Sequence, residues 1–206
     1  MEPQENRVTL EVLEALPLDL SAFPDHSVDW RVYQWIESAK EYAEADELKL
    51  AIKVLSSGMD QCQRHPFCLY QRGLYYARLA WYGKAADDFR ECIFREPNFV
   101  DIWHSYGYAM ARQGNHKMAI AAYTKLLDCK PETRGVHLLR AASYMLEDKI
   151  TLALEDIEIA KLRRSPYLRR LVKLLLEEAR QREEKKLNKK RPRKQDNPAI
   201  NCEAIQ

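Results

Sequence analysis

The residues best suited to holding a metal are two cysteines and a histidine at equal spacing. Cys62, His65 and Cys68 lie three residues apart, and thiolate and imidazole are ligands that zinc prefers in tetrahedral sites. A structural zinc site needs a fourth ligand, for which Cys92 is a candidate, and the three residues straddle Pro66 at the expected junction of two helices. Cysteine is also common as a small buried hydrophobic residue. We therefore predict no metal site and no cofactor.

Other residue types that perform catalysis are unfavourably placed. His104 and Ser105 are adjacent, and consecutive helical residues do not face one another. The carboxylate pairs at 87–88 and 155–156 recur at one place of an internal repeat, which predicts the solvated face of a helix. There is no G-x-S-x-G, no glycine-rich phosphate loop and no H-E-x-x-H. We predict that the protein is not an enzyme.

The composition favours a helical protein without a membrane span. Charged residues make up 31% of the 206 residues, and only 6 residues are glycine. No apolar run approaches the roughly 18 residues of a membrane-spanning helix, so we predict no membrane insertion. Five cysteines without a framework spacing indicate a reducing compartment. The expected location is the cytoplasm, with the nucleus as an alternative.

The charge is distributed unevenly along the chain. Residues 1–160 carry 18 Lys and Arg against 25 Asp and Glu, whereas residues 161–194 carry 15 against 4. We call the densest positive cluster the basic arm, which comprises Lys189, Lys190, Arg191, Arg193 and Lys194. Such clusters serve as nuclear import signals or bind nucleic acid. Nucleic-acid binding is the weaker prediction, because no aromatic residue is interleaved to stack on bases.

An internal repeat of 34 residues organises the chain. One column of the repeat is always alanine: Ala51, Ala85, Ala119 and Ala153. A second column is always very small: Ala39, Gly73, Gly107 and Ala141. A third column, four residues after each alanine, is bulky and apolar: Leu55, Phe89, Tyr123 and Ile157.

These columns predict two helices in each unit, joined by a short turn. The small residues let the two backbones approach closely, and the bulky residues fill the space beside that contact. Pro97, Pro131 and Pro166 end the second helices, because proline cannot donate a backbone hydrogen bond. In the first unit, Gln63 occupies the position at which a proline is expected. We therefore expect the second helix of that unit to run about a turn longer, toward Pro66.

The pattern resembles the tetratricopeptide repeat, most closely between Val100 and Thr133, where Trp103, Tyr106-Gly107 and Pro131 stand in place. The resemblance implies an all-α, right-handed superhelical solenoid of about four helix-turn-helix units followed by a C-terminal capping helix. The expected organisation is an N-terminal segment 1–31, units 32–65, 66–99, 100–133 and 134–167, a capping helix 168–190, and a basic, then disordered tail 191–206.

The resemblance also implies a function in protein interaction, as an adaptor or scaffold, with a peptide or helix of a partner held in a concave groove. The predicted groove residues are Tyr33, Ile36, Lys40, Phe67, Tyr70, Leu74, His104, Tyr108 and Leu138 at family groove positions, with Arg112 beside them. This lining favours an apolar or amphipathic segment, with Tyr70 and Tyr108 as anchors. The alternative is a nuclear or nucleic-acid-associated factor that uses the basic arm, with the repeats as a tether.

One subset of the family uses a Lys/Asn/Arg clamp for the terminal carboxylate of a chaperone. Starting from the first unit, the clamp positions hold Ile36, Lys40, Gln71, Asp101 and Ser105, and starting one unit later they also fail to match. Binding of chaperone tails by such a clamp is therefore disfavoured. A competing occupant of the groove is the chain's own amphipathic stretch from Val8 to Leu16.

Overall fold

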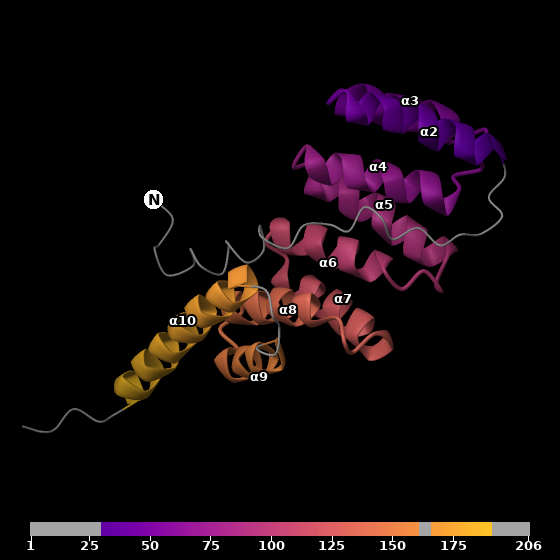
Figure 1. The fold of residues 1–206 in the computed structure, drawn as a ribbon. Helices are drawn as coiled ribbons and strands as arrows, with labels where there is room; N and C mark the ends of the chain where they lie inside the picture. Colours follow the sequence, from indigo (N-terminus) through magenta and orange to yellow (C-terminus); the bar gives the residue numbers. More distant parts are fainter. Residues whose placement is uncertain (1–29, 161–165, 191–206) are drawn as a thin grey trace, which may run out of the picture.

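The computed structural model describes residues 30–160 and 166–190, and all regular structure among them is helical (Figure 1). The helices are α2 (Trp30–Glu44), α3 (Leu48–Gly58), α4 (Pro66–Arg78), α5 (Tyr82–Arg95), α6 (Ile102–Arg112), α7 (His116–Cys129), α8 (Arg134–Leu146), α9 (Ile150–Ala160) and α10 (Pro166–Lys190). Most of the predicted N-terminal segment and the tail after Lys190 lie outside the described residues.

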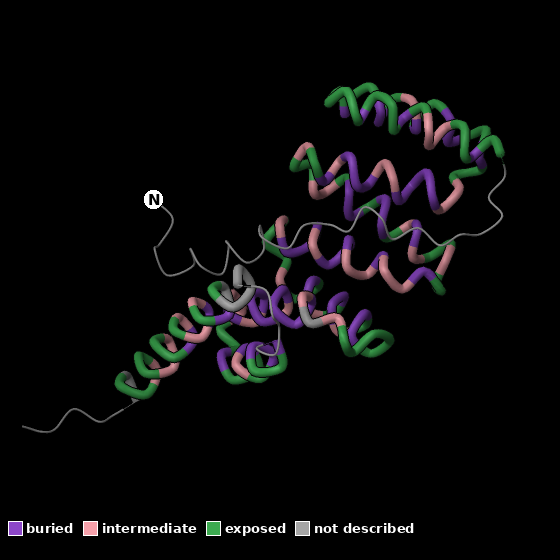
Figure 2. The backbone as a smooth tube through the Cα atoms, viewed as in Figure 1, coloured by how far each residue is buried: buried purple, intermediate pink, exposed green. Residues whose placement is uncertain are grey.

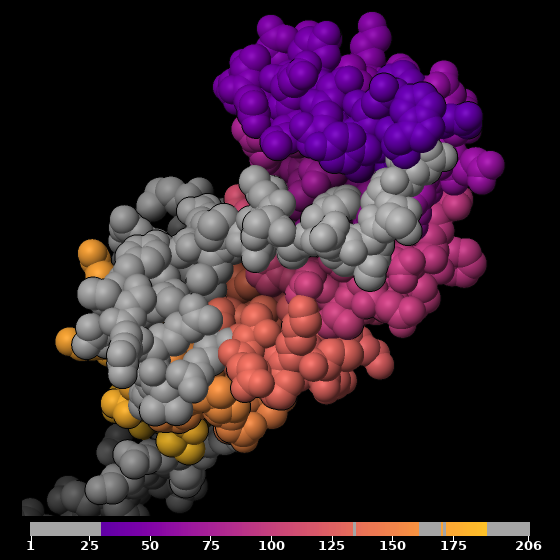
Figure 3. All heavy atoms as spheres, turned by 45° about the vertical axis from the view of Figure 1, so that its right-hand side comes forward, coloured from indigo at the N-terminus to yellow at the C-terminus, as the bar shows by residue number. Residues whose placement is uncertain are grey.

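The helices form four consecutive pairs that stack into a solenoid. The first helices, α2, α4, α6 and α8, each contact the next one, and each second helix packs against the first helix of the following unit. Figure 3 shows the pairs following one another from α2 and α3 at one end of the molecule. The prediction of an all-α solenoid of helix pairs is confirmed. The helices α2, α4, α6 and α8 form one layer, and we call the outer surface of this layer the first-helix face.

The two helices of each unit meet where the predicted columns place small side chains. All four alanines of the repeat and all four bulky residues beside them are inaccessible to solvent. A Cβ atom added to Gly73 would lie 2.6 Å from the Phe89 ring, and one added to Gly107 would lie 2.6 Å from the Tyr123 ring. Buried residues accordingly lie along the sides where helices meet (Figure 2). The absence of a side chain at these glycines therefore sets how closely the helices approach.

The turn inside each unit has the same backbone geometry in all four copies. Asp46, Ala80, Gly114 and Asp148 occupy equivalent places and have φ between 59° and 83°. The next amide donates to a carbonyl five residues back, as from Trp81 to Tyr76 at 2.9 Å, which closes the C-terminus of the first helix. Only one of the four is glycine. Aspartate adopts the left-handed region more readily than most residues, whereas alanine disfavours it, so the packing of the helices imposes this conformation on Ala80.

The second helix of the first unit is shorter than expected. α3 ends at Gly58, and residues 59–64 form turns. Gln63 and Arg64 both have positive φ, near 51° and 53°, which reverses the chain. Arg64 is held there by an ion pair with Glu91 of α5. The prediction of a longer helix is wrong because the packing of the second unit redirects the chain before Pro66.

Two carboxylates that we expected on a solvated face are buried. Arg72 donates to both carboxylate oxygens of Asp88, at 2.8 and 2.7 Å, and Arg140 does the same with Asp156, at 2.7 and 2.8 Å. Burial raises the pKa of Asp88, and the Arg72 guanidinium opposes that shift. The neighbours Asp87 and Glu155 are exposed. Adjacent residues of a helix point in directions about 100° apart, so one member of each pair faces the arginine.

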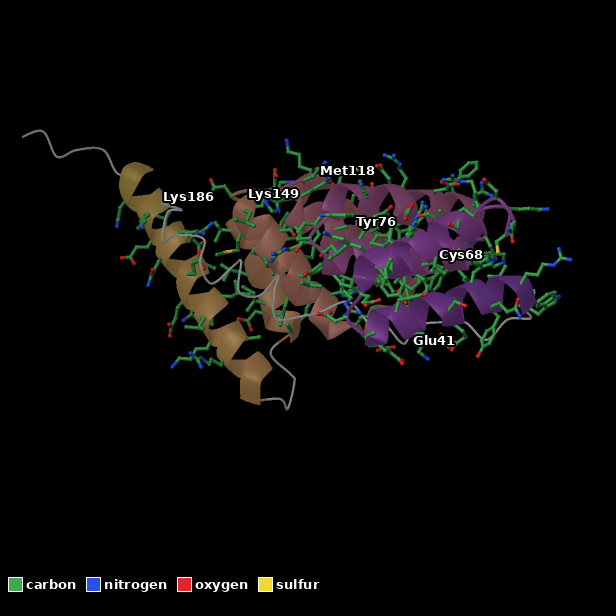
Figure 4. The ribbon with its side chains drawn as sticks, turned by 90° about the horizontal axis from the view of Figure 1, so that it is seen from above. Glu41, Cys68, Tyr76, Met118, Lys149 and Lys186 are labelled. Carbon is green, nitrogen blue, oxygen red and sulfur yellow. The ribbon has the colours of Figure 1, made fainter. Side chains whose placement is uncertain are left out.

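The C-terminal helix α10 packs on α9 and α8 through a short apolar stripe. Val172, Leu175 and Ala179 are buried in this contact. Farther along, the guanidinium of Arg182 donates to the Met145 carbonyl at 2.8 Å, and Lys186 donates to the Asp148 carbonyl at 2.8 Å. Lys186 accordingly lies close to the turn that ends at Lys149 (Figure 4). Among the described helices, none is long and apolar enough to cross a membrane.

Replacing Gly107 with alanine tests the close approach of α6 and α7. The new methyl group would overlap the Tyr123 ring, and overpacking of this kind costs about 1–3 kcal/mol. We expect Gly107→Ala to lower the free energy of unfolding by about that amount in urea denaturation. Gly83→Ala is the control, because its Cβ meets only the mobile amide end of Gln113. Equal stability of the two variants would contradict the packing described above.

Replacing Ala80 with glycine tests the strain in the intra-unit turns. Alanine in the left-handed region costs roughly 1–2 kcal/mol, whereas the entropy that glycine loses on folding is about 0.5–1 kcal/mol. We expect Ala80→Gly to stabilise the protein by about 0.5–1 kcal/mol, measured by urea denaturation. Ala77→Gly, three residues earlier in the last turn of α4, should instead destabilise it by about 1 kcal/mol or more. A loss of stability in both variants would mean that the turn is unstrained.

Candidate peptide-binding face

Six of the ten predicted groove residues are accessible, and they lie on two helices. On α2, Tyr33 is 60% exposed, Lys40 is exposed and Ile36 is half-buried. On α6, three residues at successive turns are half-buried, namely His104, Tyr108 and Arg112. The two helices flank α4, which contacts both of them. The accessible set therefore combines aromatic rings with cationic groups on either side of α4.

The other four predicted residues belong to the core. Phe67, Tyr70, Leu74 and Leu138 have exposed fractions of 5%, 1%, 0% and 1%. The Tyr70 ring lies 5.0 Å from the ring of Phe99 and 5.8 Å from that of Phe89, and its hydroxyl is 3.3 Å from Ser105 Oγ. Tyr70 is thus a packing residue between α4 and α6. The structure corrects its assignment as a surface anchor, since a buried ring presents no area to a partner.

Tyr108 belongs to an aromatic and cationic cluster. The rings of Tyr108 and Tyr82 meet edge to face at 6.2 Å, and the Arg112 guanidinium lies 5.3 Å from the centre of the Tyr82 ring. Arginine over an aromatic face is an attractive arrangement, and the guanidinium has five N–H donors suited to a carboxylate. Sequence analysis missed Tyr82, because it opens a second helix. This cluster can receive an apolar side chain next to an acidic one.

A second cluster of the same chemistry was not predicted. The Lys84 ammonium lies 4.7 Å from the Trp81 ring and 5.6 Å from the Tyr76 ring, and the Arg72 guanidinium lies 5.7 Å from the Tyr76 ring. Trp81 is 40% exposed. The signal that could have indicated this cluster is an aromatic pair flanking an intra-unit turn. The cluster covers the turn, so packing accounts for it.

Among the residues that the structure describes, the buried Tyr123 hydroxyl has no hydrogen-bond partner. Its ring is inaccessible and fills the space over Gly107, and burial raises the pKa of this phenol. Phe89 occupies the equivalent place one unit earlier and makes the same contact without a hydroxyl. The hydroxyl therefore adds a desolvation cost that the ring contact does not require.

Three of the residues considered above as zinc ligands, His65, Cys68 and Cys92, have structural roles. The His65 imidazole accepts a hydrogen bond from the Phe67 amide at 3.3 Å and so caps α4. Burial raises the pKa of Cys68 to about 12, and that of Cys92 also to about 12, which keeps both thiols protonated. Within residues 30–160 and 166–190, no group of three or more His, Cys, Asp or Glu could hold a metal ion.

The basic arm falls at the edge of the described structure. Lys189 and Lys190 are the last two residues of α10, and Arg191, Arg193 and Lys194 lie outside the described residues. The preceding cation of this helix, Lys186, also pairs with the Asp148 carboxylate at 2.7 Å. One part of the positive charge of α10 therefore serves packing.

The helix pairs and their repeated contacts match a known family. The profile of the tetratricopeptide repeat matches residues 100–133, which are the unit formed by α6 and α7. The α6–α7 unit is therefore a tetratricopeptide repeat, and the relatives support the same kind of repeat for the rest of the solenoid. A curated relative is the anaphase-promoting complex subunit cut9 of Schizosaccharomyces pombe (strain 972), which is 25% identical over 154 residues. That match covers 73% of this chain but 21% of the relative, so the chain spans about a fifth of its length.

Solved structures share the same tetratricopeptide-repeat solenoid. MamA from Desulfovibrio magneticus RS-1, from residue 41 to its end, superposes with a TM-score of 0.64 at 14% identity, covering 80% of this chain and all of that MamA fragment. Cut9 in the APC/C hetero-tetramer Cut9-Hcn1 superposes with a TM-score of 0.59 at 18% identity, covering 69% of this chain and 29% of Cut9. At these identities the likeness establishes the fold alone.

Removing the Tyr123 hydroxyl tests whether it carries a desolvation cost. An unsatisfied buried hydroxyl costs about 1–3 kcal/mol, although relaxation around it recovers part of that. We expect Tyr123→Phe to leave the melting temperature unchanged or to raise it. Phe89→Tyr introduces a hydroxyl at the equivalent place. We expect this variant to have a lower melting temperature, measured by calorimetry. Destabilisation of Tyr123→Phe by more than about 1 kcal/mol would mean that the hydroxyl has a partner.

Proposed function

We propose that this chain is a non-catalytic interaction adaptor whose first-helix face binds an apolar or amphipathic segment of a partner protein. Tetratricopeptide-repeat proteins mediate interactions between proteins, and one relative is by name a subunit of a complex. The observation that carries the proposal is the accessible combination of Tyr33 and Lys40 on α2 with Tyr108 and Arg112 on α6.

The chemistry of these side chains defines the partner segment. The exposed ring of Tyr33 and the half-buried ring of Tyr108 offer large contact areas at a low cost in rotamer entropy, and aromatic residues usually dominate interface energy. The ammonium of Lys40 and the guanidinium of Arg112 favour acidic groups beside the apolar contacts. The expected ligand is thus a short segment that carries both apolar and acidic side chains.

The residues of α4 contribute to the proposal as support. The buried rings of Phe67 and Tyr70 pack against Phe99, at 6.4 and 5.0 Å. They hold α4 against the segment that leads into α6, and rigid placement lowers the entropic cost of binding.

The test selects peptides from a random 12-residue display library on the immobilised full-length chain and measures Kd by fluorescence anisotropy. A double variant, Tyr33→Ala with Tyr108→Ala, should weaken binding at least tenfold, because loss of interface aromatic anchors commonly costs about 2 kcal/mol. Phe94→Ala is the matched control, since Phe94 is 84% exposed on the second helix α5. It should change Kd less than twofold.

Two results would contradict the proposed site. Peptides that bind the double variant as tightly as the unaltered chain would place binding elsewhere. A single-stranded oligonucleotide bound more tightly than any selected peptide, with an affinity that collapses as salt rises, would favour the nuclear or nucleic-acid-associated alternative through the basic arm. Circular dichroism and melting curves of each variant establish that the fold is retained.

A further inference from the structure

The first-helix face carries positive charge at its accessible positions. Lys40 is exposed, with its ammonium 4.0 Å from the Glu37 carboxylate, and Arg112 is half-buried. The carboxylate at the start of α6, that of the N-cap residue Asp101, accepts two contacts from the Lys130 ammonium, at 2.7 and 2.8 Å. That ion pair neutralises it. The face therefore combines aromatic contact area with the cationic ends of Lys40 and Arg112.

The sequence before α2 has the complementary chemistry. Residues 1–29 contain seven carboxylates and a single cation, Arg7. Within them, Val8, Val12 and Leu16 are spaced by four residues, with Leu13 beside them. Glu11 and Glu14 are interleaved with these apolar residues in the sequence. Apolar and acidic groups are what the first-helix face favours.

The tether is long enough for the two to meet. Thirteen residues separate Leu16 from Trp30, the first residue of α2, and they span up to about 45 Å when extended. Neighbouring packed helices lie about 8–10 Å apart, so α4 and α6 are within reach. A tether of this length gives an effective concentration near the millimolar range. A second copy of the chain at micromolar concentration competes poorly with that.

We propose that residues 8–16 of this chain bind in cis to the first-helix face, over α4 and between the accessible side chains of α2 and α6, and so compete with the partner segment. This inference rests on the proposed function of that face, because it assigns the face an internal competitor. A partner then binds with an affinity reduced by the fraction of molecules in which the face is occupied. Carboxylates at positions 11 and 14 contribute through Lys40 and Arg112.

Photo-cross-linking in the full-length chain tests the contact without any partner. Photoreactive p-benzoylphenylalanine in place of Leu13 keeps that position apolar, and irradiation at 5 µM is followed by peptide mapping. We expect intramolecular links to peptides of α4 or α6. The same group in place of Ile200, near the other terminus, should give none. Links only to α9 or α10, or no links, would overturn the proposal, as would dimers whose yield rises with concentration.

Charge reversal within the segment tests the electrostatic part. Adding Glu11→Lys and Glu14→Lys to the photoreactive chain should reduce the α4 and α6 links at least fivefold. The matched control, Glu2→Lys with Glu5→Lys, makes the same change in net charge outside residues 8–16 and should reduce them less than twofold. Equal loss in both double variants would overturn the local pairing, because only general charge would then matter.

Peptide binding distinguishes failure of the cis contact from failure of the proposed function. In the full-length chain, Val12→Asp with Leu16→Asp should tighten the Kd of a selected peptide at least threefold. Missing cross-links combined with peptide binding that depends on Tyr33 and Tyr108 would overturn the cis contact alone. Cross-links to α4 or α6 combined with peptide binding that ignores both tyrosines would overturn the proposed function alone.

Discussion

The close approach of the two helices in each unit is the contact on which the rest of the solenoid depends. At Gly73 and Gly107 the rings of Phe89 and Tyr123 lie so near the backbone that no side chain could be accommodated. The first and last units make the corresponding contact with Ala39 and Ala141, which are also inaccessible. Because every pair is built around the same small contact, the units are similar enough in shape to stack, and each stacked pair covers the apolar side of its neighbour.

The units nevertheless differ in how their helices are joined. The second and fourth units contain the buried pairs Arg72–Asp88 and Arg140–Asp156, and each arginine also reaches the previous unit, through Ser56 or Thr124 at 3.1 Å. In the third unit, Tyr106 and Ala122 stand at the places of arginine and aspartate. Removing one partner of such a pair leaves a buried charge uncompensated, which is costly. These pairs therefore link units one to two and three to four specifically.

Packing also decides which side chains remain for recognition. On α4, the rings at the predicted groove positions are buried by contacts with Phe89 and Phe99. On α6, Tyr108 and Arg112 instead lie next to Tyr82 at the surface. The first-helix face thus alternates between helices that stabilise and helices that can bind. An acidic, apolar ligand suits this pattern, and the chain carries such a sequence at its own N-terminal side.

The sequence by itself determined the repeat period, the helix pairs and the residues at their contacts, because a solenoid is stabilised by contacts within a unit and with its neighbours, which recur in register. It could not determine the burial of Tyr70, the burial of Asp88 and Asp156, or the early end of α3. Each of these depends on a group from another part of the chain: Phe99 and Ser105 around Tyr70, an arginine beside each aspartate, and Glu91 holding Arg64. Only the tertiary structure decided them, since a side chain's environment is set by what the fold brings against it and not by its place in the repeat.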